Sequence, residues 1–333
     1  MQTISGEEFR EEAGRRRGLP PALVKELTRL DNAKAIRELA ETYGVLALAI
    51  GLAAWQMTWW AVLPALVVIA SRQQALFVLA HDAAHYRLFK SRLWNDIWGR
   101  LSAGLIGYSM ATYRVVHRLH HNHLYEPQDP DIPLHGGYPR GRAYLARKLL
   151  ADVCGLNAWK TYAYFFGAPA LNDDVGAENR PLDDTSPALR RTARRDRWVV
   201  VALHVALLAA ALTGGWLVEY LLLWLLPLVT LLQPLLRLRA ICEHGAVRDL
   251  SSPLTAARTN LGPRWLIWAM FPHHVNYHIE HHTYPSVPMY NLPACHRAMQ
   301  AHGLLEGAEV RHLGDTLARV FAPRESAPAA GTA

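Results

Sequence analysis

Three short segments of the chain carry histidines at intervals that suit a metal site. They read HDAAH at 81–85, HRLHH at 117–121 and HIEHH at 278–282. Residues three and four positions apart lie on the same face of an α-helix, so each segment presents its histidines together. Spacing alone leaves the metal open, because imidazole binds Fe, Zn, Cu and Ni. The candidate ligands in these segments are His81, His85, His117, His120, His121, His278, His281 and His282.

The number of histidines predicts two metals. A single ion takes about four to six ligands, fewer than the eight available. A ninth candidate is His244, in RAICEHGAV. One HxxxH is common in helices, but two HxxHH segments and an HxxxH, each just beyond an apolar stretch, predict a shared site. Three neighbouring carboxylates, Asp82, Glu243 and Glu280, could accept the second ring N–H of a ligand and fix its tautomer.

The other histidines fall outside this repeated pattern. We expect solvated surface side chains at His135, His296, His302 and His312, and a satisfied histidine within an apolar stretch at His204. The pattern leaves open His123, His273 and His274, which lie close to the clusters.

Two long apolar stretches predict an all-α integral membrane protein. Residues 42–71 contain no charged residue, and residues 198–236 contain only Glu219. Each stretch exceeds the roughly 20 residues that one crossing requires. Each also breaks near its middle, at WQMTWW (55–60) and TGGW (213–216). We therefore expect four transmembrane helices in two hairpins, with spans near 37–55, 59–80, 198–213 and 216–238.

The charge distribution predicts the orientation. The tips of both hairpins lack Lys and Arg, whereas the N-terminal arm and the segments after the second and fourth spans are basic. The positive-inside rule places these basic segments in the cytoplasm. We expect a multi-pass protein of the bacterial inner membrane with its site on the cytoplasmic side. The net charge of +7 is explained by a basic face near anionic lipid, so no nucleic-acid partner is expected.

The domain organisation follows from these spans. Residues 1–36 form a cytoplasmic arm, residues 37–322 one domain, and residues 323–333 a disordered tail. The histidine-rich cytoplasmic cap comprises 81–197 and 239–322. Within it, 93–113 is expected to be an interfacial or shallow re-entrant helix, and 141–167 is expected to be interfacial. Residues 125–140 are expected to form a loop rich in Pro, Gly and Asp, and 172–196 a charged linker.

The histidine segments resemble the three histidine boxes of the membrane fatty acid desaturase and hydroxylase superfamily. HDAAH, HRLHH and NYHIEHHTYPSVP carry the resemblance, which runs from about His81 to Leu292. It implies two irons, O₂ as co-substrate, a four-span bundle with a cytoplasmic cap, and the eight box histidines as ligands. The further histidine of the family maps onto His244. Some members have, four residues earlier, an Asn that bonds a metal-bound water, and this chain has Ala240.

The resemblance implies a fatty acyl desaturase that introduces a double bond into a lipid acyl chain. An unactivated C–H bond is beyond any side-chain acid or base, so a metal that activates O₂ is required. The apolar substrate is expected to enter from the bilayer, through a tunnel between spans two and four. The three cysteines form no CxxC pair, so electrons must come from an external ferredoxin, rubredoxin or cytochrome with its reductase.

Several other functions remain open. A hydroxylase, a carotenoid oxygenase or an alkene-forming fatty acid decarboxylase of the same superfamily would use the same histidines. A metal transporter would place its ligands near the bilayer midplane. A zinc-binding membrane receptor would need fewer ligands.

The predicted orientation can be tested by labelling. A cysteine in place of Thr58, at the first hairpin tip, should react with an impermeant thiol reagent added outside intact cells. A cysteine in place of Asn122, beside the second cluster, should stay unlabelled, because the positive-inside rule puts it in the cytoplasm. The unsubstituted protein gives the background labelling. The reverse labelling pattern would show that the orientation is opposite to the predicted one.

Overall fold

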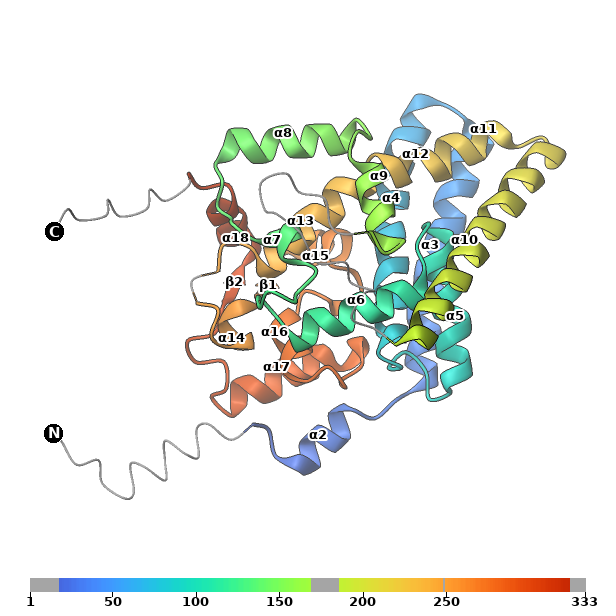
Figure 1. Ribbon diagram of the computed structural model, residues 1–333. Coiled ribbons are helices and arrows are strands. Elements are labelled where there is room, and N and C mark those ends of the chain that lie inside the picture. Colours follow the sequence, from blue (N-terminus) through green and yellow to red (C-terminus); the bar gives the residue numbers. More distant parts are fainter. Residues whose placement is uncertain (1–17, 169–185, 248, 324–333) are drawn as a thin grey trace, which may run out of the picture.

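The computed structural model describes residues 18–168, 186–247 and 249–323 (Figure 1). Residues 1–17 of the predicted arm, the first part of the predicted linker and nearly all of the predicted tail lie outside these residues. The described chain is built mainly of helices, with one short parallel pair of strands, β1 (Thr259–Leu261) and β2 (Val310–His312).

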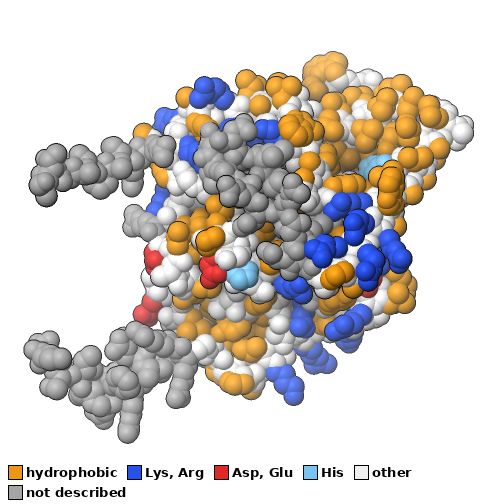
Figure 2. Space-filling model, in the orientation of Figure 1, with side chains coloured by type: hydrophobic (Ala, Val, Ile, Leu, Met, Phe, Trp, Pro, Cys, Tyr) orange, Lys and Arg blue, Asp and Glu red, His pale blue; other side chains and the backbone are white. Residues whose placement is uncertain are grey.

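Four helical segments are long and apolar enough to cross a membrane. They are α3 (Asn32–Gln56), α4 (Trp59–Ala84), α10 (Pro187–Gly214) and the interrupted helix Leu217–His244. They lie together at one side of the molecule, and hydrophobic side chains cover this side (Figures 1 and 2). Helix α4 is the most buried of the four, whereas α10 exposes large apolar side chains such as Trp198, Val205 and Leu212. The four predicted segments are confirmed as apolar helices, each extending beyond its predicted bounds.

Helix α10 begins eleven residues before the predicted third span, at Pro187 rather than at residue 198. Ser186 accepts a hydrogen bond from the amide of Leu189, and Pro187 occupies the first turn, a combination that favours helix initiation. The second half of the predicted charged linker is therefore helical. Its arginines occupy the first turns of α10, and Figure 2 shows basic side chains gathered where this helix begins.

The fourth apolar segment is not a regular helix. It consists of α11 (Leu217–Glu219), the π-helical turn η1 (Tyr220–Leu225), α12 (Leu226–Val229) and α13 (Leu232–His244). Pro227 has no amide hydrogen to donate within the helix, and this loss favours the wider turn that precedes it. Helix α13 carries His244 at its end.

Short helices form the cap around the ends of the long ones. Before α10 these are α2 (Pro21–Leu27), α5 (Arg92–Leu105), α6 (Met110–Asn122), α7 (Ile132–His135), α8 (Arg142–Val153) and α9 (Ala158–Phe165). After α13 follow α14 (Pro253–Ala256), α15 (Arg264–Met270), η2 (Pro272–His274), α16 (His278–Thr283), η3 (Met289–Asn291), α17 (Leu292–Ala301) and α18 (Leu313–Val320). Helix α5 has 14 residues, too few to cross a bilayer, as expected for the segment 93–113.

One buried aspartate fixes the start of α6. The carboxylate of Asp196, on α10, accepts hydrogen bonds from Ser109 Oγ at 2.9 Å and from the amide of Ala111 at 2.9 Å. It also pairs with Arg100 Nε at 3.0 Å. Ser109 in turn caps α6 by accepting from the amide of Thr112. A negative charge at a helix N-terminus is favourable, so Asp196 holds in place the helix that carries the second histidine segment.

A second buried charge joins the end of α13 to the strands. The guanidinium of Arg258 is fully buried and donates to the carbonyls of Cys242 at 3.1 Å and Gly245 at 2.9 Å. Its Nε pairs with Glu309 at 3.3 Å. Breaking such a pair by removing one partner leaves an uncompensated buried charge.

Glu309→Gln should therefore destabilise the protein by about 3 kcal/mol at pH 7. Burial alone would raise the pKa of Glu309, but the hydrogen bond from Arg311 and the charges of Arg258 and Arg319 outweigh it and lower the pKa to about 2. The ordinary value is 4.5, so the carboxylate stabilises the fold above this pH, and the benefit is lost as the pH falls toward 2.

Denaturant unfolding in detergent at a series of pH values measures this effect. The difference between the wild type and Glu309→Gln should shrink between pH 4.5 and the acid limit. Glu306→Gln, at an exposed position on the same turn, should change stability by less than about 0.5 kcal/mol. A pH-independent difference would contradict the assigned role of Glu309.

Candidate metal centre

The structure brings all nine candidate histidines together in two adjoining groups. Within each group, one nitrogen of every ring lies within 4.8 Å of the others. The five-histidine group contains His81, His85, His117, His121 and His281. The four-histidine group contains His120, His244, His278 and His282.

Helix geometry explains why the HxxHH segments serve both groups. On α6, His117 and His121 are four residues apart and join the five-histidine group, whereas His120 joins the other. On α16 the division is reversed, because the pair His278 and His282 enters the four-histidine group and His281 the five-histidine group. Adjacent helical positions point apart by about 100°, so each segment divides its rings between two centres.

Two rings of the four-histidine group have a defined tautomer. His120 Nδ1 donates to Asp129 Oδ1 at 3.0 Å, and His244 Nδ1 donates to the carbonyl of Ala256 at 3.1 Å. In a neutral imidazole the other nitrogen then carries a lone pair. These two Nε2 atoms face each other at 3.2 Å, and His278 Nε2 lies 2.8 Å from His244 Nε2.

This arrangement fits a bound cation. Two lone pairs at such a distance repel each other and cannot form a hydrogen bond. Metal–nitrogen bonds of about 2.1 Å at near-right angles place neighbouring nitrogens about 3.0 Å apart, which matches the observed separations. The residues present therefore suit a metal ion between them.

The five-histidine group has the same close spacing of Nε2 atoms. The Nε2 atom of His117 lies 2.9 Å from that of His85 and 3.0 Å from that of His121. His121 Nε2 is also 2.9 Å from His281 Nε2. The Nε2 atom of His81 is buried without a hydrogen-bond partner among the described residues. The ring of His117 stacks on Tyr113, with centroids 5.1 Å apart and an interplanar angle of 11°.

Burial keeps most of these rings neutral, the form that binds metal. It lowers the pKa of His85 to about 4, helped by the charges of Arg87 and Arg114. Burial also lowers the pKa well below the ordinary value in five further rings of the cap: His117, His121, His278, His281 and His282. His120 is the exception, because burial opposes its protonation but Asp129 outweighs it and raises the pKa.

The three carboxylates expected behind the ligands have other partners. Asp82 accepts from the amide of Met289 at 3.3 Å, and Glu280 accepts from Thr259 Oγ1 at 2.6 Å and from His296 Nδ1 at 2.5 Å. Glu243 pairs with Arg239 and lies 3.8 Å from His278 Nε2. In the described chain, none of the three is recorded as a hydrogen-bond acceptor for a candidate histidine. Each lies next to a histidine on its helix, where side chains diverge.

Asp129 is a site residue that no sequence pattern indicated. This buried carboxylate in the loop 125–140 bonds His120 and also accepts from the amides of Tyr125 and Asp131, at 3.0 Å and 2.9 Å. An aspartate in a loop between prolines belongs to no periodic pattern, so its contact with His120 is visible only in the folded chain.

The remaining histidines differ from one another in their surroundings. His135 is buried beside His120 and Asp129, so the expectation of a solvated ring was wrong, since α7 packs against α13. His296 is half-buried and bonds Glu280, whereas His302 and His312 are exposed as expected. His204 Nε2 donates to the carbonyl of Gly104 at 2.9 Å, which satisfies it. The three that the pattern left open, His123, His273 and His274, lie outside both groups.

Residues 57–313 match the sequence model of one protein family, described as fatty acid desaturase. The chain belongs to this family. Relatives include the dihydrorhizobitoxine desaturase of Bradyrhizobium elkanii, which is 28% identical over 80% of this chain and 76% of its own length. The acyl-lipid 8-desaturase of Rebecca salina is 26% identical over 70% of this chain and 55% of its own length. The zeaxanthin 4-ketolase of Chlamydomonas reinhardtii is 34% identical, but over only 29% of this chain and 23% of its own length.

Membership of the fatty acid desaturase family makes the protein an oxidoreductase. The family uses non-haem iron, and the two histidine groups could hold such a metal. The interpretations as a metal transporter or a zinc-binding receptor are thereby replaced by an enzymatic one.

His244→Ala tests the ninth ligand. His244 lies between His120 and His278 in the four-histidine group, so its loss should remove iron from that group alone. Metal analysis of the purified variant should give about one iron per chain instead of two, and activity should be lost. Retention of both irons with normal turnover would show that His244 is not a metal ligand and serves only as a cap at the end of α13. His274, the alternative ninth candidate, lies outside both groups, and His274→Ala should keep both irons.

Proposed function

We propose that the protein is an O₂-dependent di-iron desaturase that introduces a double bond into an acyl chain. The observation that carries the proposal is the division of nine imidazoles into two adjoining groups with converging Nε2 atoms. Membership of the desaturase family supports iron as the metal and desaturation as the reaction.

The two groups would each hold one iron. His81, His85, His117, His121 and His281 would hold the first, and His120, His244, His278 and His282 the second. When bound, iron together with O₂ supplies the oxidising power that removal of hydrogen from an unactivated chain requires. All other tasks fall to the protein, which positions the ligands, keeps them neutral and guides the chain.

The reaction balances with two electrons from outside the chain. One –CH₂–CH₂– unit, one O₂, two electrons and two protons give one –CH=CH– unit and two waters. The substrate itself loses two hydrogens, the donor supplies the two electrons, and the two protons come from the solvent. The donor would be a ferredoxin, rubredoxin or cytochrome with its reductase, because Cys154, Cys242 and Cys295 are separate free thiols.

Several residues of this chain prepare the site. Asp129 and the carbonyl of Ala256 hold the Nδ1–H groups of His120 and His244, which points their Nε2 lone pairs inward. Tyr113 fixes the ring plane of His117 by stacking. Asp82, Glu243 and Glu280 would act one layer further out, through Met289, Arg239 and Thr259.

The protein would act as a four-span membrane enzyme with a cytoplasmic cap. The four long apolar helices and their exposed hydrophobic side chains support this placement (Figure 2). The nine histidines lie at the cap ends of α4 and α13 and on the cap helices α6 and α16. We place the enzyme in a bacterial inner membrane. Its chain would consist of a cytoplasmic arm (1–36), a catalytic domain (37–322) and a tail (323–333).

The function is tested by product analysis. Cells expressing the protein should gain unsaturated acyl products that cells lacking it do not contain. His281→Ala should abolish the products and lower the iron content, because His281 contributes to the five-histidine group. His302→Ala, at an exposed site outside both groups, should leave both unchanged. Hydroxylated products would show that the protein is a hydroxylase and not a desaturase. Full turnover by His281→Ala would refute the assigned centre.

A further inference from the structure

A small cavity reaches both histidine groups. It has a volume of about 90 Å³, and His117 of the five-histidine group and His120, His244 and His278 of the other contribute to its wall. Phe77 of α4 and Leu236 of α13 face it as well. This inner cavity therefore lies between the second and fourth apolar helices, where the substrate is expected.

The wall of the inner cavity is polar as well as aromatic. Arg239, Glu243, Asp131 and His135 line it together with aromatic rings. Arg239 is 9% exposed; its Nε pairs with Glu243 at 3.2 Å, and its guanidinium lies 4.9 Å from the ring centroid of Phe77. An acyl chain alone would need none of these charges.

In two buried side chains of this cavity, particular nitrogen atoms lack a hydrogen-bond partner among the residues described. Arg239 Nη1 has none, and neither ring nitrogen of His135, which is 1% exposed, has one. A buried N–H group without an acceptor is costly, and more so when it belongs to a cation. Such groups require an explanation, and an anionic ligand that accepts from Arg239 supplies one.

A second cavity adjoins the first. This outer cavity has a volume of about 110 Å³ and shares Leu134, Tyr164, Phe165, Leu236 and Ala240 with the inner one. Its wall adds Lys148, Lys160 and Arg237, and no Asp or Glu lines it in the described chain. Arg237 pairs with Asp152 outside this wall. The methyl group of Ala240 stands at the junction, where a larger side chain would narrow the passage.

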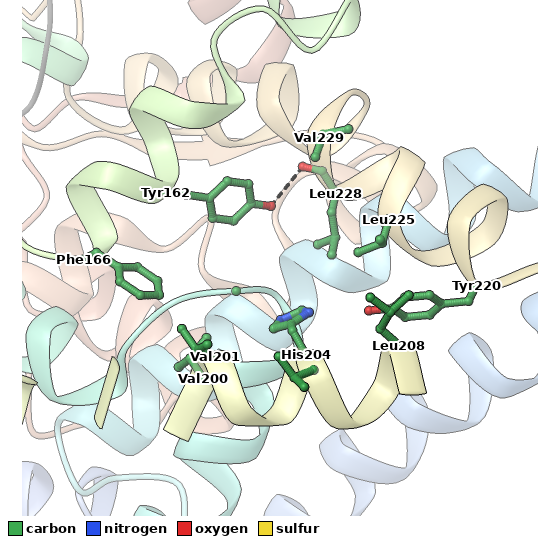
Figure 3. Close-up of a pocket in the computed structure, with 12 residues that line it drawn as sticks. Tyr162, Phe166, Val200, Val201, His204, Leu208, Tyr220, Leu225, Leu228 and Val229 are labelled. Atoms are coloured by element: carbon green, nitrogen blue, oxygen red, sulfur yellow. Dashed lines mark hydrogen bonds between the residues drawn. The ribbon is translucent and has the colours of Figure 1, made fainter. Parts of the chain in front are cut away.

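The size of these cavities limits the substrate. A cavity of about 150 Å³ accommodates benzene, so the inner cavity holds only a few carbon atoms. The larger apolar cavity of about 470 Å³, shown in Figure 3, lies between α9, α10 and the fourth apolar segment. Its described wall includes His204 but none of the nine candidate ligands, and it shares no residue with the inner or outer cavity.

We propose that the substrate is a short aliphatic compound with a free carboxylate, which enters past Lys148 and Lys160 and binds Arg239 beside the histidine groups. The proposal rests on the proposed desaturase function and chooses a free acid over a chain esterified in a membrane lipid. A guanidinium suits a carboxylate because its planar fork donates two parallel hydrogen bonds. Glu243 on the same wall could in addition accept from an amino group next to the carboxylate.

Binding to the iron-loaded protein in detergent tests the proposal without turnover. Calorimetric titration would compare pentanoate, methyl pentanoate, 2-aminopentanoate and vesicles of a stearoyl phospholipid. Pentanoate or 2-aminopentanoate should bind at least about tenfold more tightly than the methyl ester, and the better of the two acids shows whether an amino group is recognised. Equal affinity of acid and ester, or binding of the phospholipid alone, would overturn the proposal.

Substitutions locate the carboxylate. Arg239→Gln should weaken binding of the acids about tenfold and leave the ester unchanged, and Arg239→Lys, which keeps the charge beside Glu243, should weaken it less. Ala240→Leu should hinder acid and ester alike. Arg297→Gln, at an exposed position on α17, should change neither. Iron content is measured for each variant to show that the site is intact, and unaltered acid binding by intact Arg239→Gln would refute the role of Arg239.

Failure of this inference can be told apart from failure of the proposed function. Double bonds formed in phospholipid chains, with no binding of either acid, would leave the function standing and remove the inference. Acid binding that depends on Arg239, with no unsaturated product from any substrate, would support the binding site for a free acid and refute the proposed desaturase function.

Discussion

The structure depends on the convergence of imidazole lone pairs in a buried space. Nε2 atoms approach one another at 2.8–3.2 Å, a separation that suits neighbouring ligands of one metal ion. Every element that carries a histidine must therefore be held in place for the rings to converge. Buried polar contacts do so: Asp129 on His120, the carbonyl of Ala256 on His244, and Asp196 at the start of α6.

The membrane helices and the cap have different tasks in this arrangement. Helix α4 is the central element, buried along most of its length, and it presents His81 and His85 where it meets the cap. The segment that ends in α13 presents His244 in the same region. The cap then closes over these ends with α6 and α16. Arg258, directly before β1, donates to a carbonyl at the end of α13 and pairs with Glu309, directly before β2. These contacts join both strands to the end of α13.

The electrostatic surroundings of the two groups differ. In the five-histidine group, burial is the largest cause of the lowered pKa values, and neighbouring histidines and arginines add to it. The four-histidine group adjoins Asp129, Asp131, Glu243 and Arg239, and there a carboxylate reverses the effect of burial on His120. The inner cavity opens on this polar side.

Much of the site could be predicted from the sequence, because helical spacing is a local property. HxxxH and HxxHH fix which rings share a face, the apolar stretches predict four long helices, and the count of imidazoles predicts two centres. The division of His120 from His121, and of His281 from His282, follows from the same 100° step once the helices are known.

Only the tertiary structure decided which long-range contacts form. Asp129 meets His120 because a loop without periodicity folds back over α6, and His135 is buried because α7 packs against α13. Asp82 and Glu280 accept from Met289 and Thr259, Glu243 pairs with Arg239 close to His278, and Arg239 lines the cavity beside the histidine groups. The sequence states which side chains a helix presents, but the direction from which another segment approaches depends on packing of the whole chain, and no local pattern records it.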